Sequence, residues 1–202
     1  MNYIRILDYG SGNIGAYRAI GARIGIEILP TSVPTDITGS ELLIVPGVGN
    51  VGECMTLLEN SGYANLLKER FIERRPILAV CSGFQIFGER SSETPNELLS
   101  LLPLEFLELD SKFGPVPQMG WRHVKGMDSI LPSKPVYFSH GYHGKITEAI
   151  SNVLTSHYNR GSEQILASIR TPSFAGAQFH PEKSNLAGRL FLKKVIRELI
   201  DA

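Results

Sequence analysis

Apolar residues in the first half of the chain fall alternately into short continuous runs and into helix-spaced sets. The continuous runs cover residues 3–7, 25–29, 41–47 and 76–80, and runs of this kind predict strands that are covered on both faces of a sheet. Residues 12–25 and 51–74 have helical spacing, with a break near Ser61-Gly62. Strands that alternate with helices indicate βαβ units and a mainly parallel sheet.

Beyond residue 100 the pattern changes to strand-like segments that turns separate, with no long helix between them. The segments are LPLEFLELD, PVPQMGWRHVKGM, PVYFSHGYHG, EQILASI and FAGAQFH. They predict an antiparallel extension of the first sheet. Residues 185–200 then repeat apolar positions every three or four residues, which predicts an amphipathic helix that packs on the sheet. The fold class is therefore α/β.

Composition limits the classes of protein to which the chain can belong. Its 202 residues, with no linker between segments, predict a single domain over residues 1–202. Lys plus Arg and Asp plus Glu number 20 each, so nothing favours a nucleic acid or a membrane surface as partner. The two cysteines, Cys54 and Cys81, form no disulfide framework and fit a reducing compartment. The N-terminus has the pattern of neither a signal peptide nor a membrane span, so we expect a cytoplasmic protein.

A glycine pattern near the N-terminus matches the dinucleotide-binding fingerprint. Gly10, Gly12 and Gly15 spell G-x-G-x-x-G between a predicted strand and a predicted helix. That site also needs an acidic residue at the end of the second strand, and the sequence GIEILPTSVP has none there. We therefore expect a tight turn, or a loop that touches a partner, rather than a nicotinamide cofactor site.

Cys81 follows the apolar run of residues 76–80 at the carboxyl end of a predicted parallel strand, where ligands bind in open α/β sheets. The small residues Ala79, Ser82 and Gly83 surround it and allow a sharp strand-to-helix turn of the nucleophile-elbow kind. The backbone N–H groups of a helix start stabilise a thiolate. Cys81 is therefore a candidate nucleophile, whereas Cys54 lies inside a predicted helix and fits a buried, inert thiol.

A cysteine nucleophile needs a base, and His180 is the best candidate among the five histidines. It ends an apolar strand, and Pro181 after it disfavours helix at that position. In extended chain Glu182 would project to the same side as His180 and could hold one imidazole nitrogen. A metal site on His180 and Glu182 would need a third ligand, which no clustered pattern supplies, so we expect no metal.

The reaction would also need donors for an oxyanion. The amide of Ser82, directly after the nucleophile, is one candidate. The turn Pro46-Gly47-Val48-Gly49 ends the neighbouring strand and offers Gly47 and Val48 as further candidates. The alternative is a strand-terminating turn without a catalytic part.

Several motifs in this order resemble the class I (triad) glutamine amidotransferases over nearly the whole chain. The motifs are Pro46–Gly49, Cys81–Gln85 and His180–Ser184, with Asp8–Asn13 and Pro117–Trp121 pointing to the branch that forms the glutaminase subunits of imidazole glycerol phosphate synthases. The resemblance implies a flavodoxin-like three-layer sandwich with no cofactor. It also implies that a thioester forms on Cys81 while glutamine is hydrolysed, with His180 as base and Glu182 as its orienting partner.

The resemblance further assigns residues to the substrate and to a partner. In the family a (β/α)8-barrel cyclase docks over the glutaminase and receives ammonia through a tunnel, as a heterodimer. The alternative for Trp121 is that it is an aromatic residue of the core with no part in an interface. The implied substrate-binding residues are Gly49, Gln85, Glu93 and Tyr142, and the implied interface residues are Asn13, Met119, Gly120, Trp121 and Lys183.

Other interpretations stay open at this stage. Ala79 and Ser82 differ from the usual family residues, as does the segment after Glu93, so a paralogous subunit that feeds ammonia to another synthase, such as one that amidates a sugar, is the first alternative. A non-catalytic regulatory subunit of the same fold is the second. The complete set of Cys81, His180 and Glu182 counts against it, because nothing structural requires those three residues.

Overall fold

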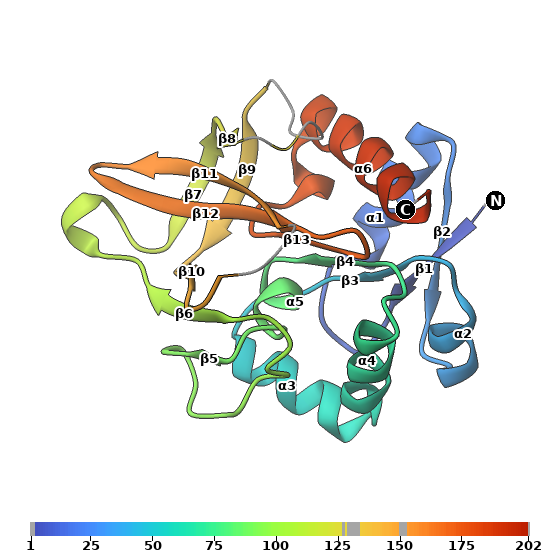
Figure 1. Cartoon of the computed structure of the whole chain (residues 1–202). Helices are drawn as coiled ribbons and strands as arrows, with labels where there is room; N and C mark the ends of the chain where they lie inside the picture. Colours follow the sequence, from blue (N-terminus) through green and yellow to red (C-terminus); the bar gives the residue numbers. More distant parts are fainter. Residues whose placement is uncertain (1–2, 127, 129–133, 150–152, 202) are drawn as a thin grey trace.

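The protein is described by a computed structural model that covers residues 3–126, 128, 134–149 and 153–201. A large sheet forms the central layer, and helices cover both of its faces (Figure 1). The α/β three-layer architecture expected from the sequence is therefore confirmed.

The central sheet has eight strands in the order β2-β1-β3-β4-β13-β12-β11-β8. From β2 to β13 neighbouring strands run parallel, and from β13 to β8 they run antiparallel. Cys81 directly follows β4, near the middle of the sheet. The strand bounds are Tyr3–Leu7 (β1), Glu27–Thr31 (β2), Leu43–Val45 (β3), Ile77–Val80 (β4), Lys125–Gly126 (β8), Leu154–Arg160 (β11), Glu163–Arg170 (β12) and Phe174–Ala177 (β13).

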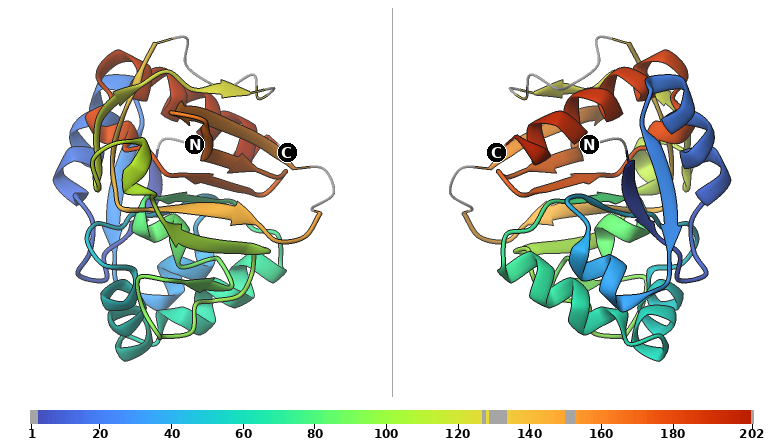
Figure 2. Two further views of the ribbon diagram at one scale, coloured as in Figure 1. Left: turned by 90° about the vertical axis from the view of Figure 1, so that its left-hand side faces the viewer. Right: turned by 90° about the vertical axis from the view of Figure 1, so that its right-hand side faces the viewer.

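Two groups of helices cover the sheet. Helices α1 and α6 pack side by side on one face, and α2 to α5 lie on the other (Figures 1 and 2). In β4, Leu78 and Val80 join the core beneath α1 and α6, while Ile77 and Ala79 join the opposite core. Continuously apolar strands result because both faces are buried. The helix bounds are Ile14–Ile24 (α1), Pro34–Gly39 (α2), Val51–Asn60 (α3), Tyr63–Ile72 (α4), Ser82–Gln85 (α5) and Asn185–Ile200 (α6).

Two smaller sheets stand beside the central one. One has three strands in the order β10-β6-β5, and the other pairs β7 with β9. Two single 3-10 turns, η1 and η2, complete the described elements. The bounds are Arg90–Ser91 (β5), Leu104–Glu108 (β6), Gln118–Arg122 (β7), Val136–His140 (β9), Tyr142–Ile146 (β10), Ser111–Phe113 (η1) and Pro181–Lys183 (η2).

The sequence pattern predicted most of these elements and missed some. The C-terminal helix has the predicted bounds, and the break near Ser61-Gly62 separates α3 from α4. The second strand begins two residues later than expected. The antiparallel extension is confirmed for β12 and β8, but the expectation is wrong for β6, β7, β9 and β10, which together with β5 form the smaller sheets. Helix α2 and the strands β5 and β11 were not predicted.

The edge strand β2 and the buried side chain of Arg70 are two further features of the fold. Strand β2 lies at a free edge and contains Pro30, a residue that sheets tolerate at edges. Arg70 on α4 is only 1% exposed. Its guanidinium donates to the carbonyl oxygens of Ile37, Ser40 and Pro76 at 2.8, 2.9 and 3.0 Å, and thereby ties α4 to the end of α2 and the start of β4.

Candidate active site

Cys81 lies at a sharp turn between β4 and α5. Its backbone has φ 53° and ψ −121°, a sparsely populated conformation that stores strain in a residue with a side chain. Hydrogen bonds hold the turn: the Cys81 amide donates to the Ala177 carbonyl at 2.8 Å, and the Cys81 carbonyl accepts from Phe84 and Gln85. The predicted elbow is present, although α5 is a single turn and supplies less helix dipole than a longer helix would.

His180 and Glu182 form a buried pair beside this turn. His180 Nδ1 lies 2.7 Å from Glu182 Oε1, and the two side chains are 3% and 2% exposed. His180 is extended, as Pro181 after it predicts, but Glu182 lies in the 3-10 turn η2 rather than in extended chain. The expected pairing of His180 with Glu182 thus arises from a tight turn. The Ser184 hydroxyl stabilises this turn by donating to the His180 carbonyl at 2.6 Å.

The thiol and the carboxylate act on the imidazole from two sides. Burial lowers the pKa of His180, but the charge of Cys81 and a hydrogen bond with it, together with Glu182, outweigh burial and raise that pKa to about 10. Since Glu182 occupies Nδ1, Nε2 is the nitrogen left for Cys81. This arrangement can hold a proton on His180 beside a negatively charged sulfur.

Gln178 contacts the thiol from the strand side and was not predicted from the sequence. Its Nε2 donates to Cys81 Sγ at 3.8 Å, and its Oε1 accepts from Gln85 Nε2 at 3.1 Å. Gln178 is fully buried. A polar residue two positions before His180 in an apolar run was the signal that could have identified it, because alternate strand residues share a side.

A pocket of about 350 Å³ opens above Cys81 and brings most of the predicted site residues together. This volume is in the range of small-molecule sites. The polar groups in it come from five separate parts of the chain. The lining residues are Val48, Gly49, Asn50, Cys81, Ser82, Gln85, Glu93, Pro117, Ser139, His140, Gly141, Tyr142, His180 and Lys183.

The candidate oxyanion donors differ in their surroundings. The Ser82 amide is the first N–H of α5 and has no acceptor within that helix, while the Ser82 hydroxyl donates to the Gly49 carbonyl at 2.6 Å. The Val48 amide instead donates to Ser11 Oγ at 3.1 Å, so it is engaged outside the pocket. Gly47 packs directly against Gly83.

The predicted substrate residues Gly49, Gln85, Glu93 and Tyr142 all line the pocket. Glu93 Oε2 accepts from the Val51 amide at 2.9 Å at the start of α3, and burial raises the pKa of Glu93. The Tyr142 carbonyl accepts from Gln85 Nε2 at 3.3 Å and from His140 Nδ1 at 2.7 Å. His140, which was not predicted, also accepts from the Tyr158 hydroxyl at 3.1 Å through Nε2.

Most of the predicted interface residues gather near the pocket. Trp121 is 43% exposed and Met119 is 61% exposed, so the core alternative for Trp121 is wrong. The Trp121 ring packs edge-on against the Tyr137 ring, and Lys183 Nζ lies 6.0 Å from the centre of the Tyr137 ring. We call Met119, Trp121 and Tyr137 the β7–β9 patch; Gly120, with φ 114°, lies within it.

The glycine turn near the N-terminus is a close-packed turn. A Cβ atom on Gly12 would lie 2.6 Å from the side chain of Pro46, so the glycine turn packs closely against the loop after β3. Asn13 is exposed and caps α1, because its Oδ1 accepts from the Ala16 amide at 3.0 Å. Among the described residues no group of three or more His, Cys, Asp or Glu side chains could hold a metal ion. No helix in the described part of the chain is long and apolar enough to span a membrane.

Comparison with known proteins identifies the family and close relatives. The model of the family described as "Glutamine amidotransferase class-I" matches residues 6–197. The chain is 33% identical, over 96% of its length and 98% of the relative's, to "Imidazole glycerol phosphate synthase subunit HisH" of Carboxydothermus hydrogenoformans.

Other relatives are much longer than this chain. It is 32% identical over 98% of its length to "Imidazole glycerol phosphate synthase hisHF, chloroplastic" of Arabidopsis thaliana, but spans only 35% of that protein. Among solved structures, "Crystal structure of glutamine amidotransferase" has a TM-score of 0.74 at 16% identity and covers 98% of this chain and 100% of that one. At this identity the likeness concerns the fold alone.

Proposed function

The chain belongs to the glutamine amidotransferase class-I family, and we propose that it is the glutaminase subunit of an imidazole glycerol phosphate synthase in histidine biosynthesis. The observation that carries this proposal is the buried set of Cys81, His180 and Glu182 at one end of a substrate-sized pocket. The names of full-length relatives support the choice of synthase. L-glutamine is the substrate, and glutamate and ammonia are the products.

In the proposed mechanism Cys81 acts as the nucleophile. His180 takes the thiol proton, and Sγ attacks the side-chain amide carbon of glutamine. The C–N bond then breaks, His180 gives its proton to the leaving nitrogen, and ammonia departs from a glutamyl thioester. Water, activated by His180, attacks the thioester and releases glutamate and the thiol. Glu182 keeps the imidazole oriented and stabilises its charged form.

The pocket supplies groups that suit glutamine. The raised pKa of Glu93, caused by burial, is what a carboxylate waiting for a cation would have, and the α-ammonium of glutamine is such a cation. Gln85, Tyr142 and Gly49 line the same space and would hold the rest of the amino acid. The Ser82 amide would donate to the oxyanion, and an amide from the turn at Gly47 and Val48 would join it only if Val48 left Ser11 Oγ.

We propose a cyclase with a (β/α)8-barrel as the partner. The longer relative named above, hisHF of Arabidopsis thaliana, carries both subunit letters in its name, which supports a cyclase as the partner of this chain. The β7–β9 patch, with Lys183 beside it, exposes the Trp121 ring and the Met119 side chain near the pocket, and Trp and Met are favoured at interfaces. Ammonia released on Cys81 would pass through such an interface without reaching water.

Glutamate release measured with and without candidate partners tests this function. We expect low activity alone, strong stimulation by a cyclase of the histidine pathway, and loss of activity in Cys81→Ala. Stimulation only by a synthase of another pathway would replace the proposal with the paralogue alternative. Full activity in Cys81→Ala would rule out the nucleophile, and no activity with any partner would favour a regulatory subunit.

A matched pair of surface variants tests the interface. Trp121→Ala should weaken partner binding by about tenfold or more, since a buried Trp commonly contributes over 1 kcal/mol to an interface. Ile72→Ala removes an exposed apolar side chain on α4, 73% exposed, and should bind as the wild type does. Equal binding by both variants would place the interface elsewhere on the protein.

A further inference from the structure

Two buried polar atoms near the candidate triad lack a hydrogen-bond partner of ordinary geometry among the described residues. They are the hydroxyl oxygen of Tyr17 and Oε2 of Glu182. Tyr17 is 1% exposed and the Glu182 side chain 2% exposed, so neither atom has access to solvent. Unpaired buried polar groups are costly, and two such atoms of complementary character in one region suggest a shared role.

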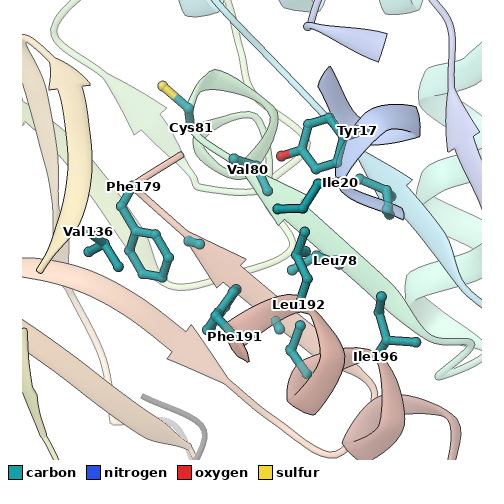
Figure 3. Close-up of a cluster of buried hydrophobic side chains, with 14 of the residues drawn as sticks. Tyr17, Ile20, Leu78, Val80, Cys81, Val136, Phe179, Phe191, Leu192 and Ile196 are labelled. Carbon is teal, nitrogen blue, oxygen red and sulfur yellow. The ribbon is translucent and has the colours of Figure 1, made fainter. Parts of the chain in front are cut away.

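The fold brings the two residues together. Tyr17 lies on α1, which packs against the turn η2 that carries Glu182. Ala16, Ala19 and Ile20, on the same helix, line a small cavity of about 180 Å³ together with Glu182. In Figure 3 the Tyr17 hydroxyl points toward the side on which Cys81 lies.

We propose that Tyr17 is a positioning residue whose hydroxyl donates a hydrogen bond to Glu182 Oε2 and holds that carboxylate against His180. Glu182 would then be fixed at both oxygens, since Oε1 already pairs with His180 Nδ1 at 2.7 Å. A carboxylate anchored at one oxygen can rotate, and the imidazole would rotate with it. This inference rests on the proposed function, because it concerns how the same three residues are held.

The protonation state of Tyr17 suits this role. Burial raises the pKa of Tyr17 well above its usual value, and the charge of Glu182 raises it further. The hydroxyl therefore keeps its proton and acts as a donor toward the carboxylate. The other titratable group in contact with Glu182 is His180, and Cys81 lies on the opposite side of that imidazole. The side chains of Arg23 and Arg189 line the cavity together with Glu182 but form no ion pair with it.

The experiment compares two variants that each delete one buried tyrosine hydroxyl. Tyr17→Phe removes the proposed donor, and Tyr63→Phe removes a hydroxyl that donates to the Ser32 carbonyl at 2.5 Å, away from the pocket. Glutaminase activity is measured on the complex with the partner cyclase. We expect kcat to fall about tenfold in Tyr17→Phe with KM within twofold, the effect of one hydrogen bond to a charged group. Tyr63→Phe should match the wild type.

A double variant separates positioning from general damage. In the Glu182→Ala background there is no carboxylate to hold, so adding Tyr17→Phe should change kcat less than twofold. A tenfold loss in that background, or an equal loss in Tyr63→Phe, would overturn the proposal. An unchanged kcat in Tyr17→Phe would also overturn it and would leave Arg23 or Arg189 as the group that fixes Glu182.

A spectroscopic measurement keeps the test independent of activity. The proton on His180 Nδ1, hydrogen-bonded to Glu182, gives a low-field NMR signal that reports the geometry of that bond. We expect this signal to move or broaden in Tyr17→Phe and to stay in place in Tyr63→Phe. An unmoved signal in Tyr17→Phe refutes the inference. If the wild type instead shows no glutaminase activity with any partner, the proposed function fails while this measurement still decides the contact.

Discussion

The backbones of Gly47 and Gly83 touch each other: a Cβ atom on Gly47 would overlap the amide nitrogen of Gly83. A Cβ atom on Gly83 would in turn lie 2.6 Å from the Pro46 carbonyl oxygen. The loop after β3 and the elbow at Cys81 can therefore approach only where both residues lack side chains. This contact sets the shape of one wall of the pocket.

We predict that Gly83→Ala lowers both stability and activity. The new methyl group meets backbone atoms that cannot move aside cheaply, so the free energy of unfolding should fall by about 1–3 kcal/mol. Urea unfolding measures it. Gly39→Ala is the matched control, because a Cβ atom there meets nothing within 4 Å. Equal stability of the two variants would show that the contact is looser than described.

The pKa of His180 should depend on Cys81. Burial lowers this pKa, and the raised value of about 10 comes chiefly from the charge of Cys81 and the hydrogen bond with it. In Cys81→Ala we therefore expect the pKa of His180 to drop by more than one unit in an NMR titration. His157, whose pKa burial lowers and which lies on β11, serves as internal control and should titrate unchanged.

The same interaction should give a pH-dependent contribution to stability. Since the folded-state pKa of His180 is raised above the unfolded value of about 6.5, its stabilisation is fully present below pH 6.5 and is lost as the pH rises through about 10. The difference in unfolding free energy between wild type and Cys81→Ala should shrink across that window. A constant difference from pH 7 to pH 10 would contradict the interaction.

His140 should make the protein sensitive to acid. Burial is the main cause that lowers the pKa of His140 to about 4, and its two nitrogens are engaged by the Tyr142 carbonyl and the Tyr158 hydroxyl. The unfolded chain therefore binds a proton that the folded chain excludes, and stability should fall by about 3 kcal/mol between pH 6.5 and pH 4. His140→Gln should lose most of this dependence in denaturant unfolding. An unchanged slope in the variant would assign the acid sensitivity to other groups.

Arg70 should be one of the strongest single supports of the fold. Arg70→Met removes the guanidinium donor from the carbonyls of Ile37, Ser40 and Pro76, of which Ser40 and Pro76 keep a second donor in Arg75 and the Leu43 amide. We therefore expect a loss of about 2 kcal/mol in thermal or urea unfolding. Arg18→Met, at an exposed position on α1, should change stability by less than about 0.5 kcal/mol. A loss of the same size in both variants would mean that charge rather than these contacts matters.

Local patterns made the first half of the fold predictable. β4 could be located because both faces of its sheet are buried, and His180 could be paired with Glu182 because two residues so near in sequence stay near in space. The run VYFSHGYHG was harder, because it is one continuous segment whose halves, before and after Gly141, belong to different sheets. No local sequence pattern marks the point at which the chain passes from one sheet to the other.

The parts of the site that the sequence did not reveal depend on distant contacts. Ser11 holds the Val48 amide across 37 positions, and Gln178 meets Cys81 across 97. A lone serine in a glycine turn has many ordinary explanations, and so does a glutamine in an apolar strand. Their partners become visible only when the parallel sheet brings the ends of β3, β4 and β13 to one edge.

The edge strand β2 has a consequence for how copies of this protein behave at high concentration. The Thr31 carbonyl accepts from Asp8 on the side of β1, so the backbone of Pro30, one residue earlier, faces the open side. Proline has no N–H to offer there. A strand from another molecule that tried to join this edge would find its donor missing, so the open side of the sheet resists edge-to-edge aggregation.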